Sequence, residues 1–367
     1  MQRGEKMRVI IGAGGTGGHL YPALALVEYI KEKEPDSEFL FVGTKDRLEA
    51  QVVPSKGYNY VGLNVHGLVG NPIKKAIAAT VFVKSIFTAK KVVKKFKPDI
   101  VIGFGGYPSA SVVEAAYRLG YKTMIHEQNS IIGLTNKILI KHVDKIVCCY
   151  DRAYQNFPKE KTYRLGNPRA SVITSIKPKE IFSKYGLDKH KPLVTIVMGS
   201  LGSKSVNEKL LESLHDFEKK DYQVLYVTGK NYYEEMKNKV GKLNHNVKLV
   251  PYIDDMPSLL KNTTLIVSRA GASTMAEISA IGVPSILIPS PYVASNHQEY
   301  NARELSDRSG ALMILEKDLN SKDFVDKVDY VINNQIVQES LRKNALALGK
   351  PNALVDMYKL IKDTLGA

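Results

Sequence analysis

The sequence contains no tryptophan and only two cysteines among its 367 residues. Those cysteines, Cys148 and Cys149, are neighbours and cannot supply the disulfide framework of a small secreted domain. No run approaches the ~18 consecutive apolar residues of a membrane span, and the polar segment 1–6 is not followed by the apolar core of a secretory signal. These absences favour a cytoplasmic protein without disulfides, and the length favours two domains.

The usual residue patterns of metal sites are also missing. The chain has no Asp-x-Asp motif and no Cys/His cluster with the spacing of metal ligands. Asp254 and Asp255 are adjacent, so their side chains would point to opposite sides of an extended segment. We therefore expect no metal and no cofactor. If the substrate is a nucleotide sugar, helix termini and basic residues must neutralise its diphosphate.

Negative charge is scarce in the first half of the chain. Residues 1–165 carry 25 basic and 14 acidic residues, a net charge of +11, whereas residues 166–367 carry a net charge of +4. This asymmetry indicates a basic face in the first half or an anionic partner. Nucleic acid, phospholipid head groups and diphosphates are the candidate partners.

The positive charge is densest at residues 71–97, which contain eight lysines and no acid. Apolar residues with helical spacing predict that Phe82–Phe96 forms an amphipathic helix covering a sheet. Ile73–Val81 is instead predicted to contact an anionic lipid surface. An ordinary helix with a solvated lysine face is the alternative. Nucleic acid is not expected, because aromatic and arginine residues do not alternate here.

Short runs rich in Val, Ile and Leu alternate with helical patterns along the whole chain. Strands are expected at Met7–Ile11, Phe39–Val42, Ile100–Ile102, Thr123–His126, Lys145–Cys148, Leu193–Met198, Gln223–Val227, Val247–Leu249, Leu265–Val267 and Ser285–Ile288. Such alternation is typical of parallel sheets covered by helices on both faces. Helical spacing at Ala23–Lys33 predicts the first of these helices.

The two halves of the chain echo each other. A strand, a glycine loop and a helix occur at Val9–Pro22 and again at Val194–Asn207, and a similar unit occurs at Gly103–Ala116 and at Ser268–Ala280. Arg164–Arg169 interrupts any regular element between the halves. We predict an α/β protein with two doubly wound Rossmann-like domains facing across a cleft.

The first glycine loop, Gly12–Gly17, satisfies the pattern G-x-G-x-x-G between a strand and a helix. A dinucleotide site would place a carboxylate at the end of the second strand, but Phe39–Val42 is followed by Gly43 and Thr44. What remains is a loop whose N–H groups attract phosphate at a helix start. A purely structural turn is the alternative.

His19 lies in the first turn of the same predicted helix. The positive end of the helix dipole favours a neutral imidazole, which could act as a general base toward a hydroxyl. Local packing or capping explains the residue equally well. In the second half, the loop Gly199–Lys204 could receive another anionic group. Glu277 could accept two ribose hydroxyls or merely complement a helix dipole.

Several motifs together resemble the MurG family of bacterial N-acetylglucosaminyltransferases. The stretches that carry the resemblance follow one another in order: GAGGTGGHLYPALAL (12–26), FVGTKDRLEAQVVP (41–54), GFGGYPSA (103–110), IHEQNS (125–130), GNPRAS (166–171), MGSLGSKSVN (198–207), YIDDMP (252–257), SRAGASTMAEISAIGVPSILIP (268–289) and NHQEYNA (296–302). The resemblance therefore covers nearly the whole chain.

The resemblance implies a GT-B fold. Residues 1–165 would bind the acceptor and an anionic membrane surface, and residues 166–344 would bind UDP-GlcNAc. A C-terminal helix at 345–367 would pack back on the first domain. The enzyme would work at the cytoplasmic face of the bacterial membrane as a peripheral protein.

The resemblance also implies the site residues. His19 and Glu127 are the candidates for the general base, and the choice between them stays open. Acceptor contacts are expected from Gly15, Thr16, Gly17, Gly18, Tyr107 and Asn129. Donor contacts are expected from Asn129, Ser200, Asn207, Ile253, Arg269, Glu277 and Gln298. Leu201 and His297 stand where the family often has glutamine, which affects individual donor contacts more than the reaction.

The implied reaction transfers GlcNAc from UDP-GlcNAc to the 4-hydroxyl of MurNAc in lipid I, the undecaprenyl-pyrophosphoryl-MurNAc-pentapeptide, and produces lipid II for peptidoglycan. An α-linked donor and a β-linked product require inversion by one in-line displacement. Transfer to diacylglycerol by a related enzyme is the alternative, and a UDP-GlcNAc epimerase shares the implied fold and donor. A non-catalytic nucleotide- or membrane-binding protein would bind UDP without turnover.

Overall fold

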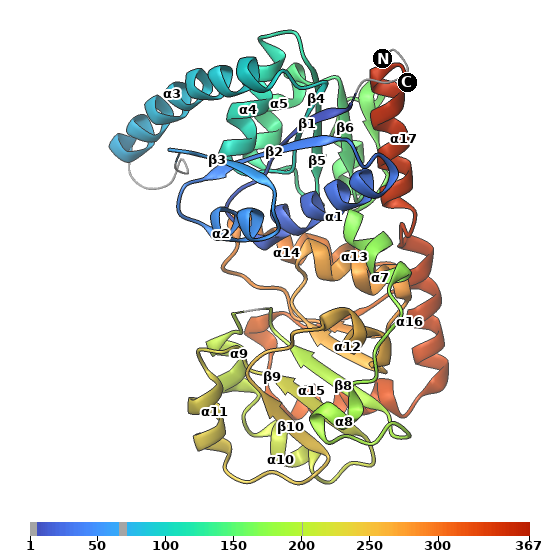
Figure 1. The fold of residues 1–367 in the computed structure, drawn as a ribbon. Helices are drawn as coiled ribbons and strands as arrows, with labels where there is room; N and C mark the ends of the chain where they lie inside the picture. Colours follow the sequence, from blue (N-terminus) through green and yellow to red (C-terminus); the bar gives the residue numbers. More distant parts are fainter. Residues whose placement is uncertain (1–5, 66–71, 200) are drawn as a thin grey trace. The chain divides into compact units, whose positions relative to one another are not determined.

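The computed structural model describes residues 6–65, 72–199 and 201–367, with the backbone alone at 72–76. The chain divides into two compact units (Figure 1). The first unit comprises Met1–Ser171 and Asn352–Ala367, and the second comprises Val172–Pro351. The chain therefore leaves the first unit once and returns to it for its last segment.

The first unit is built on a parallel sheet, which in the described residues has the order β3-β2-β1-β4-β5-β6-β7. Its strands are β1 (Arg8–Gly12), β2 (Glu38–Thr44), β3 (Asn59–Leu63), β4 (Ile100–Gly103), β5 (Lys122–Glu127), β6 (Lys145–Cys148) and β7 (Thr162–Tyr163). The inner strands are nearly continuous in apolar residues because helices cover both of their faces.

The helices of the first unit are α1 (Gly17–Lys33), α2 (Leu48–Ser55), α3 (Pro72–Phe96), α4 (Tyr107–Tyr117), α5 (Leu134–Leu139), α6 (Asp151–Gln155) and α17 (Ala353–Leu365), with α7 (Pro168–Ser175) at the boundary. Ile86 and Val93 of α3 join the core cluster to which β1, β4 and β5 contribute Ile10, Val101 and Ile125. The predicted sheet-covering helix at Phe82–Phe96 is therefore confirmed, although it is the second part of one continuous helix that also includes Ile73–Val81.

The second unit repeats the design with the strand order β10-β9-β8-β11-β12-β13. Its strands are β8 (Leu193–Val197), β9 (Gln223–Val227), β10 (Val247–Val250), β11 (Leu265–Ser268), β12 (Ser285–Leu287) and β13 (Leu312–Met313). Its helices are α8 (Phe182–Tyr185), α9 (Lys204–Lys209), α10 (Ser213–Phe217), α11 (Tyr233–Val240), α12 (Met256–Asn262), α13 (Ala272–Ile281), α14 (His297–Ser306), α15 (Ser321–Ile332) and α16 (Gln335–Leu348). The predicted class, two doubly wound parallel α/β domains, is confirmed.

The C-terminal segment differs from the single helix expected at 345–367. Ala345 belongs to α16 in the second unit, and the helix that packs in the first unit, α17, begins at Ala353. The break follows from a long-range backbone contact and from a proline. Gly349 lies so close to the backbone of Ser279 that a Cβ would approach its carbonyl oxygen to 2.6 Å, and Pro351 cannot donate a helical hydrogen bond.

Helix α17 is tied to α1 by polar and aromatic contacts. The carboxylate of Glu34 accepts hydrogen bonds from the Tyr358 hydroxyl at 2.6 Å and from the Lys362 ammonium at 2.8 Å. The rings of Tyr29 and Tyr358 meet edge to face with their centroids 5.9 Å apart. Met357 is completely buried, so the helix also contributes to the core of the first unit.

Candidate active site

The predicted site residues of the first unit lie where its strand order reverses. Strand β1 pairs with β2 on one side and with β4 on the other, and the loops after β1 and β4 meet at their carboxyl ends. Open parallel sheets bind ligands at this point, because the helices that follow the two strands lie on opposite faces. His19 follows β1, Tyr107 follows β4, and Glu127 and Asn129 follow β5.

The two glycine loops after β1 and β4 are in direct contact. Gly14 donates its N–H to the carbonyl of Gly105 at 3.2 Å, and Phe104 donates to the carbonyl of Gly12 at 2.7 Å. Gly106 has a φ of 83°, and a Cβ there would lie 2.5 Å from the oxygen of Gly14. The close approach explains why both loops consist of glycine at these positions.

His19 is half-buried in the first turn of α1, and its ring lies over the second loop. A Cβ built on Gly105 would come within 2.8 Å of the ring. The Nδ1 atom lies 2.7 Å from the carbonyl oxygen of Gly14. Because a carbonyl oxygen can only accept, Nδ1 carries the proton, and the lone pair of the neutral ring is on Nε2. The histidine thus braces the loop and retains a basic nitrogen.

The start of α1 offers N–H groups to an anion. In the part of the chain that the structure describes, the backbone N–H groups of Thr16, Gly17 and Gly18 donate to no protein acceptor. Gly15 differs from this expectation, because its N–H group donates to the carboxylate of Glu49 at 3.2 and 3.3 Å. An anionic group at this loop would therefore meet the amides from Thr16 onward.

Glu127 is almost completely buried, and both of its carboxylate oxygens accept hydrogen bonds. Oε1 accepts from the backbone N–H of Asn129 at 3.0 Å and lies 3.4 Å from its side-chain nitrogen. Oε2 accepts from the N–H of Gly133 at 2.9 Å and from the Asn136 amide at 2.8 Å. Burial raises the pKa of Glu127 above its ordinary value, although these hydrogen bonds oppose the shift. This residue organises the loop that follows β5.

Tyr107 and Asn129 border the same loops. Tyr107 is the first residue of α4 and is half-buried. Its ring makes an edge contact with Phe82 of α3, with centroids 6.3 Å apart. Asn129 is also half-buried, one turn before α5. The structure thus brings the predicted acceptor residues to one end of one sheet.

His126, beside Glu127, is buried within the same region. Its ring stacks on Phe104 with centroids 5.2 Å apart, and its Nε2–H group donates to the carbonyl of Gly166 at 2.9 Å. Burial, with a smaller contribution from nearby His19, lowers its pKa to about 4, although the hydrogen bond to Gly166 opposes the shift. His126 is therefore neutral over the physiological range. Its contacts with Phe104 and Gly166 hold the neighbouring loops.

The donor residues predicted in the second unit also follow the carboxyl ends of strands in a parallel sheet. Strands β8 and β11 are neighbours, and the loops that follow them start α9 and α13. The loops after β8 and β9 also touch, since a Cβ on Gly202 would lie 2.1 Å from the carbonyl oxygen of Thr228. Ser200 lies outside the described residues, so its predicted donor contact stays a prediction.

Arg269 is paired inside the protein, which the sequence did not indicate. Its guanidinium lies 2.5 Å from the carboxylate of Glu316, and it donates to the Ser203 hydroxyl at 2.7 Å and to the Ile288 carbonyl at 3.1 Å. Both charged groups are buried. Through the Ser203 hydroxyl the guanidinium holds the loop before α9, and its predicted donor contact stays a prediction.

Asn207 is likewise engaged with the protein. Its amide donates to the Thr228 carbonyl at 3.0 Å, and its oxygen accepts from the Tyr226 hydroxyl at 3.0 Å. Burial raises the pKa of Tyr226, so the phenol stays protonated and donates. Asn207 thereby connects α9 to the end of β9 and acts on the donor loop through that connection.

The remaining donor residues differ in what they offer. Ile253 is buried as a side chain, and in the described part of the chain no hydrogen bond uses its backbone N–H or carbonyl. Gln298 accepts from the N–H of Ser290 at 2.9 Å through its side-chain oxygen. Glu277 is buried one turn into α13, which begins after Gly271. The donor contacts expected from Ile253, Gln298 and Glu277 stay predictions.

Two domain families match this chain. The N-terminal domain of glycosyltransferase family 28 matches residues 9–148, and the C-terminal domain of the same family matches residues 193–357. A protein of Leuconostoc mesenteroides named UDP-N-acetylglucosamine–N-acetylmuramyl-(pentapeptide) pyrophosphoryl-undecaprenol N-acetylglucosamine transferase is 42% identical over 98% of this chain and all of its own length. The protein of that name from Listeria monocytogenes is 41% identical over 97% of this chain and 99% of its own.

The chain belongs to the MurG family of glycosyltransferases.

Solved structures agree with the family. The crystal structure of MurG from Acinetobacter baumannii superposes with a TM-score of 0.80 at 25% identity and covers 98% of this chain and 100% of its own. A UDP-N-acetylglucosamine 2-epimerase superposes with a TM-score of 0.71 at 13% identity, covering 99% of this chain and 97% of its own. At that identity the epimerase shares the fold alone. The GT-B class expected from the sequence is confirmed.

Relative to the MurG-family residues predicted from sequence, the structure adds Glu49 and Glu316. The sequence has no carboxylate directly after β2, but the first turn of α2 returns Glu49 to that strand end. There it accepts hydrogen bonds from the Thr44 N–H at 3.0 Å and from the Thr44 hydroxyl at 2.7 Å. An acid five residues beyond a strand end is a weak signal, because only the turn between them brings it back.

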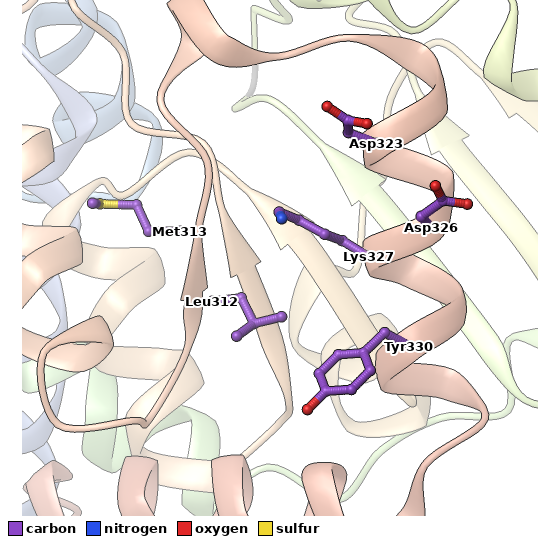
Figure 2. A pocket seen from close by; sticks show the side chains of 6 residues that line it. All are labelled: Leu312, Met313, Asp323, Asp326, Lys327 and Tyr330. Carbon is purple, nitrogen blue, oxygen red and sulfur yellow. The ribbon is translucent and has the colours of Figure 1, made fainter.

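The second unit also contains a pocket that the predicted site residues do not line. It has a volume of about 420 Å³ and lies between the edge strand β13 and α15 (Figure 2). Asp323, Asp326, Lys327 and Tyr330 line it from the helix, and Leu312 and Met313 from the strand. None of the predicted site residues is among them.

The described residues show neither a metal cluster nor a membrane-spanning helix. They contain no cluster of three or more His, Cys, Asp or Glu side chains placed to hold a metal ion. None of their helices is both long enough and apolar enough to cross a membrane.

Proposed function

We propose that this protein transfers N-acetylglucosamine from UDP-GlcNAc to the 4-hydroxyl of the MurNAc unit of lipid I, which yields lipid II. The proposal is supported by curated relatives of that name at about 40% identity over nearly the full chain. The geometric observation that carries it is His19, whose Nδ1 is bound to Gly14 and whose Nε2 holds the lone pair.

In this mechanism His19 is the general base. Nε2 takes the proton of the acceptor hydroxyl as that oxygen attacks C1 of the sugar, and UDP leaves from the opposite face. The configuration inverts in one displacement without a covalent intermediate. Glu127 is the weaker candidate, because four N–H groups already bind its carboxylate and hold it in place.

Each substrate has a set of proposed contacts. The amides of Thr16, Gly17 and Gly18 at the start of α1 bind the diphosphate of the acceptor, with Tyr107 and Asn129 beside them. The backbone of Ile253 binds uracil, the carboxylate of Glu277 accepts hydrogen bonds from the ribose hydroxyls, and Gln298 contacts the GlcNAc sugar. The charge on departing UDP is stabilised by the loop before α9, which Arg269 positions.

The first unit is proposed to lie on the anionic cytoplasmic face of the membrane through α3. Val83 and Phe87, one turn apart on that helix, are half or more exposed, as is Ile77. Lys84 and Lys91 flank them on the same exposed side, seven residues apart. Exposed apolar side chains among lysines suit a surface of anionic lipid.

The test of the reaction is release of UDP from UDP-GlcNAc with and without a lipid I analogue, in the presence of chelator. We expect release that depends on the acceptor and falls at least ~100-fold in His19→Ala. His245→Ala, which removes an exposed histidine, is the matched control and should match the wild type.

The other outcomes are equally informative. Acceptor-dependent release that persists in His19→Ala would transfer the role of base to Glu127. Release that depends on diacylglycerol instead of the lipid I analogue would assign the alternative acceptor. Binding of UDP without any release would contradict an enzymatic function for this chain.

A further inference from the structure

Glu49 and His19 contact opposite ends of one peptide group. The N–H of Gly15 donates to the Glu49 carboxylate at 3.2 Å, and the carbonyl of Gly14 accepts from His19 Nδ1 at 2.7 Å. That N–H and that carbonyl belong to the same peptide bond, which joins Gly14 to Gly15. The contacts therefore form a chain from carboxylate to peptide to imidazole.

Glu49 is held for this task by its surroundings. Its side chain is almost completely buried. The carboxylate accepts hydrogen bonds from the N–H of Gly15 and from the N–H and hydroxyl of Thr44. A Cβ on Gly14 would lie 3.2 Å from its Oε1, and one on Gly43 would lie 2.6 Å from its Cγ. Two glycines thus make room for the carboxylate beneath the loop.

We propose that Glu49 is a positioning residue that orients and strengthens the base His19 through the Gly14–Gly15 peptide. A carboxylate that accepts from the N–H of this peptide polarises the peptide group, and the Gly14 carbonyl becomes a stronger hydrogen-bond acceptor. A stronger acceptor fixes the Nδ1–H tautomer and stabilises the imidazolium that forms during the reaction. In hydrolases with a Ser-His-Asp triad the acid contacts histidine directly, whereas here a backbone amide lies between them.

The proposal rests on the proposed role of His19 as base and adds a distinct claim about its basicity. Three other titratable groups of this region have pKa values shifted by burial. Burial lowers the pKa of His126 to about 4, so that ring stays neutral. Burial raises the pKa of Tyr60, whose hydroxyl donates to the carbonyl of Thr44, and also that of Glu127 on β5.

The decisive measurement is the NMR titration of the His19 ring in full-length wild type and Glu49→Gln. The variant keeps the shape of the side chain but removes its charge. We expect the pKa of His19 to fall by about half a unit or more, since an opposite charge no longer favours the imidazolium. Glu28→Gln, which removes an exposed acid from the same helix α1, is the matched control and should leave the titration unchanged.

The pH dependence of activity provides a second measurement, and it should shift in the same direction as the pKa of His19. The acidic limb of the pH profile for kcat should move to lower pH in Glu49→Gln by the shift seen in the titration. The plateau at high pH should fall about 3- to 10-fold with KM for UDP-GlcNAc unchanged, because a weaker base transfers the proton more slowly. A folded variant whose titration and pH limb both match the wild type would overturn the proposal, whatever its rate.

Thr44→Val tests whether a change in the pKa of His19 comes from the charge of Glu49 or from loosening of the loop. It removes one donor from the carboxylate but leaves the charge, so the bond to Gly15 becomes stronger and the pKa of His19 should stay or rise. A fall would mean that the loop had merely loosened, and it would overturn the proposal even if Glu49→Gln failed to fold. Full activity of His19→Ala would instead contradict the proposed base while leaving the titration result intact.

Discussion

At the scale of single residues, the end of β5 combines two buried ionisable side chains with opposite tasks. Glu127 is surrounded by donors, whereas the ring of His126 is stacked on Phe104 and makes its polar contacts through Nε2, with the Gly166 carbonyl and the Cys149 sulfur. Its Nδ1 atom is buried and accepts no hydrogen bond from the described residues. A proton added there would find no partner, which is why burial keeps this histidine neutral.

His126 should therefore make the folded protein sensitive to acid. Its pKa is about 4 in the folded state against 6.5 in the unfolded chain, so the unfolded chain binds more protons below pH 6.5. The free energy of unfolding is unaffected above pH 6.5 and should fall by about 3 kcal/mol as the pH drops toward 4. Denaturant unfolding of wild type and His126→Gln at several pH values measures the difference.

Glutamine retains a donor for the Gly166 carbonyl but cannot take up the proton. The pH dependence of His126→Gln should accordingly be shallower than that of the wild type. The exposed His245→Gln serves as the control and should retain the wild-type slope. Equal slopes for wild type and His126→Gln would show that this ring does not carry the acid sensitivity.

At the scale of elements, α3 has two faces with different tasks. Its buried face, with Ile86 and Val93, completes the core, and its outer face presents Val83 and Phe87. Phe87 is 61% exposed, and the Lys90 ammonium lies 5.9 Å from its ring. The outer face can therefore be altered without disturbing the fold.

We expect Phe87→Ser to weaken binding to vesicles that contain anionic lipid by about 5-fold, which corresponds to about 1 kcal/mol of lost apolar contact. The free energy of unfolding should stay within ~0.5 kcal/mol of the wild type, because the side chain is exposed. Co-sedimentation with anionic and neutral vesicles measures the binding. Tyr330→Ser, which removes an exposed aromatic ring from α15, is the matched control; an equal loss in both variants would count against α3.

Most of the strands could be predicted because their apolar runs are buried on both faces. The strands missed at Asn59–Leu63, Thr162–Tyr163 and Leu312–Met313 lie near or at the sheet edges, where few apolar residues are needed. The break before α17 was also missed, because it depends on Gly349 packing against a residue seventy positions earlier. Local patterns do not contain such contacts.

The candidate site shows the same limit. His19, Tyr107 and Glu127 could be located from motifs because each directly follows a strand end. Glu49 and Glu316 were missed, since their partners lie 34 and 47 residues away along the chain. Arg269 was predicted as a donor contact, and its buried partner could emerge only from the folded chain.

At the scale of the whole molecule, each of the two compact units has its own buried core among the described residues, so we expect two unfolding transitions. Met357→Ala empties a fully buried site on α17, so the first unit should lose about 2–5 kcal/mol while the second unit is unaffected. Calorimetry should show one transition moving to lower temperature. Val328→Ala, in the core of the second unit, should move the other, and a common shift in both variants would contradict independent units.

The return of α17 to the first unit also bears on the order in which the protein is made. The second unit is one continuous stretch, Val172–Pro351, so all of it leaves the ribosome before α17 does. The first unit cannot complete its core until Met357 and the rest of α17 have been translated. Of the two units, the first is therefore the last to be completed, although most of its residues are translated before those of the second.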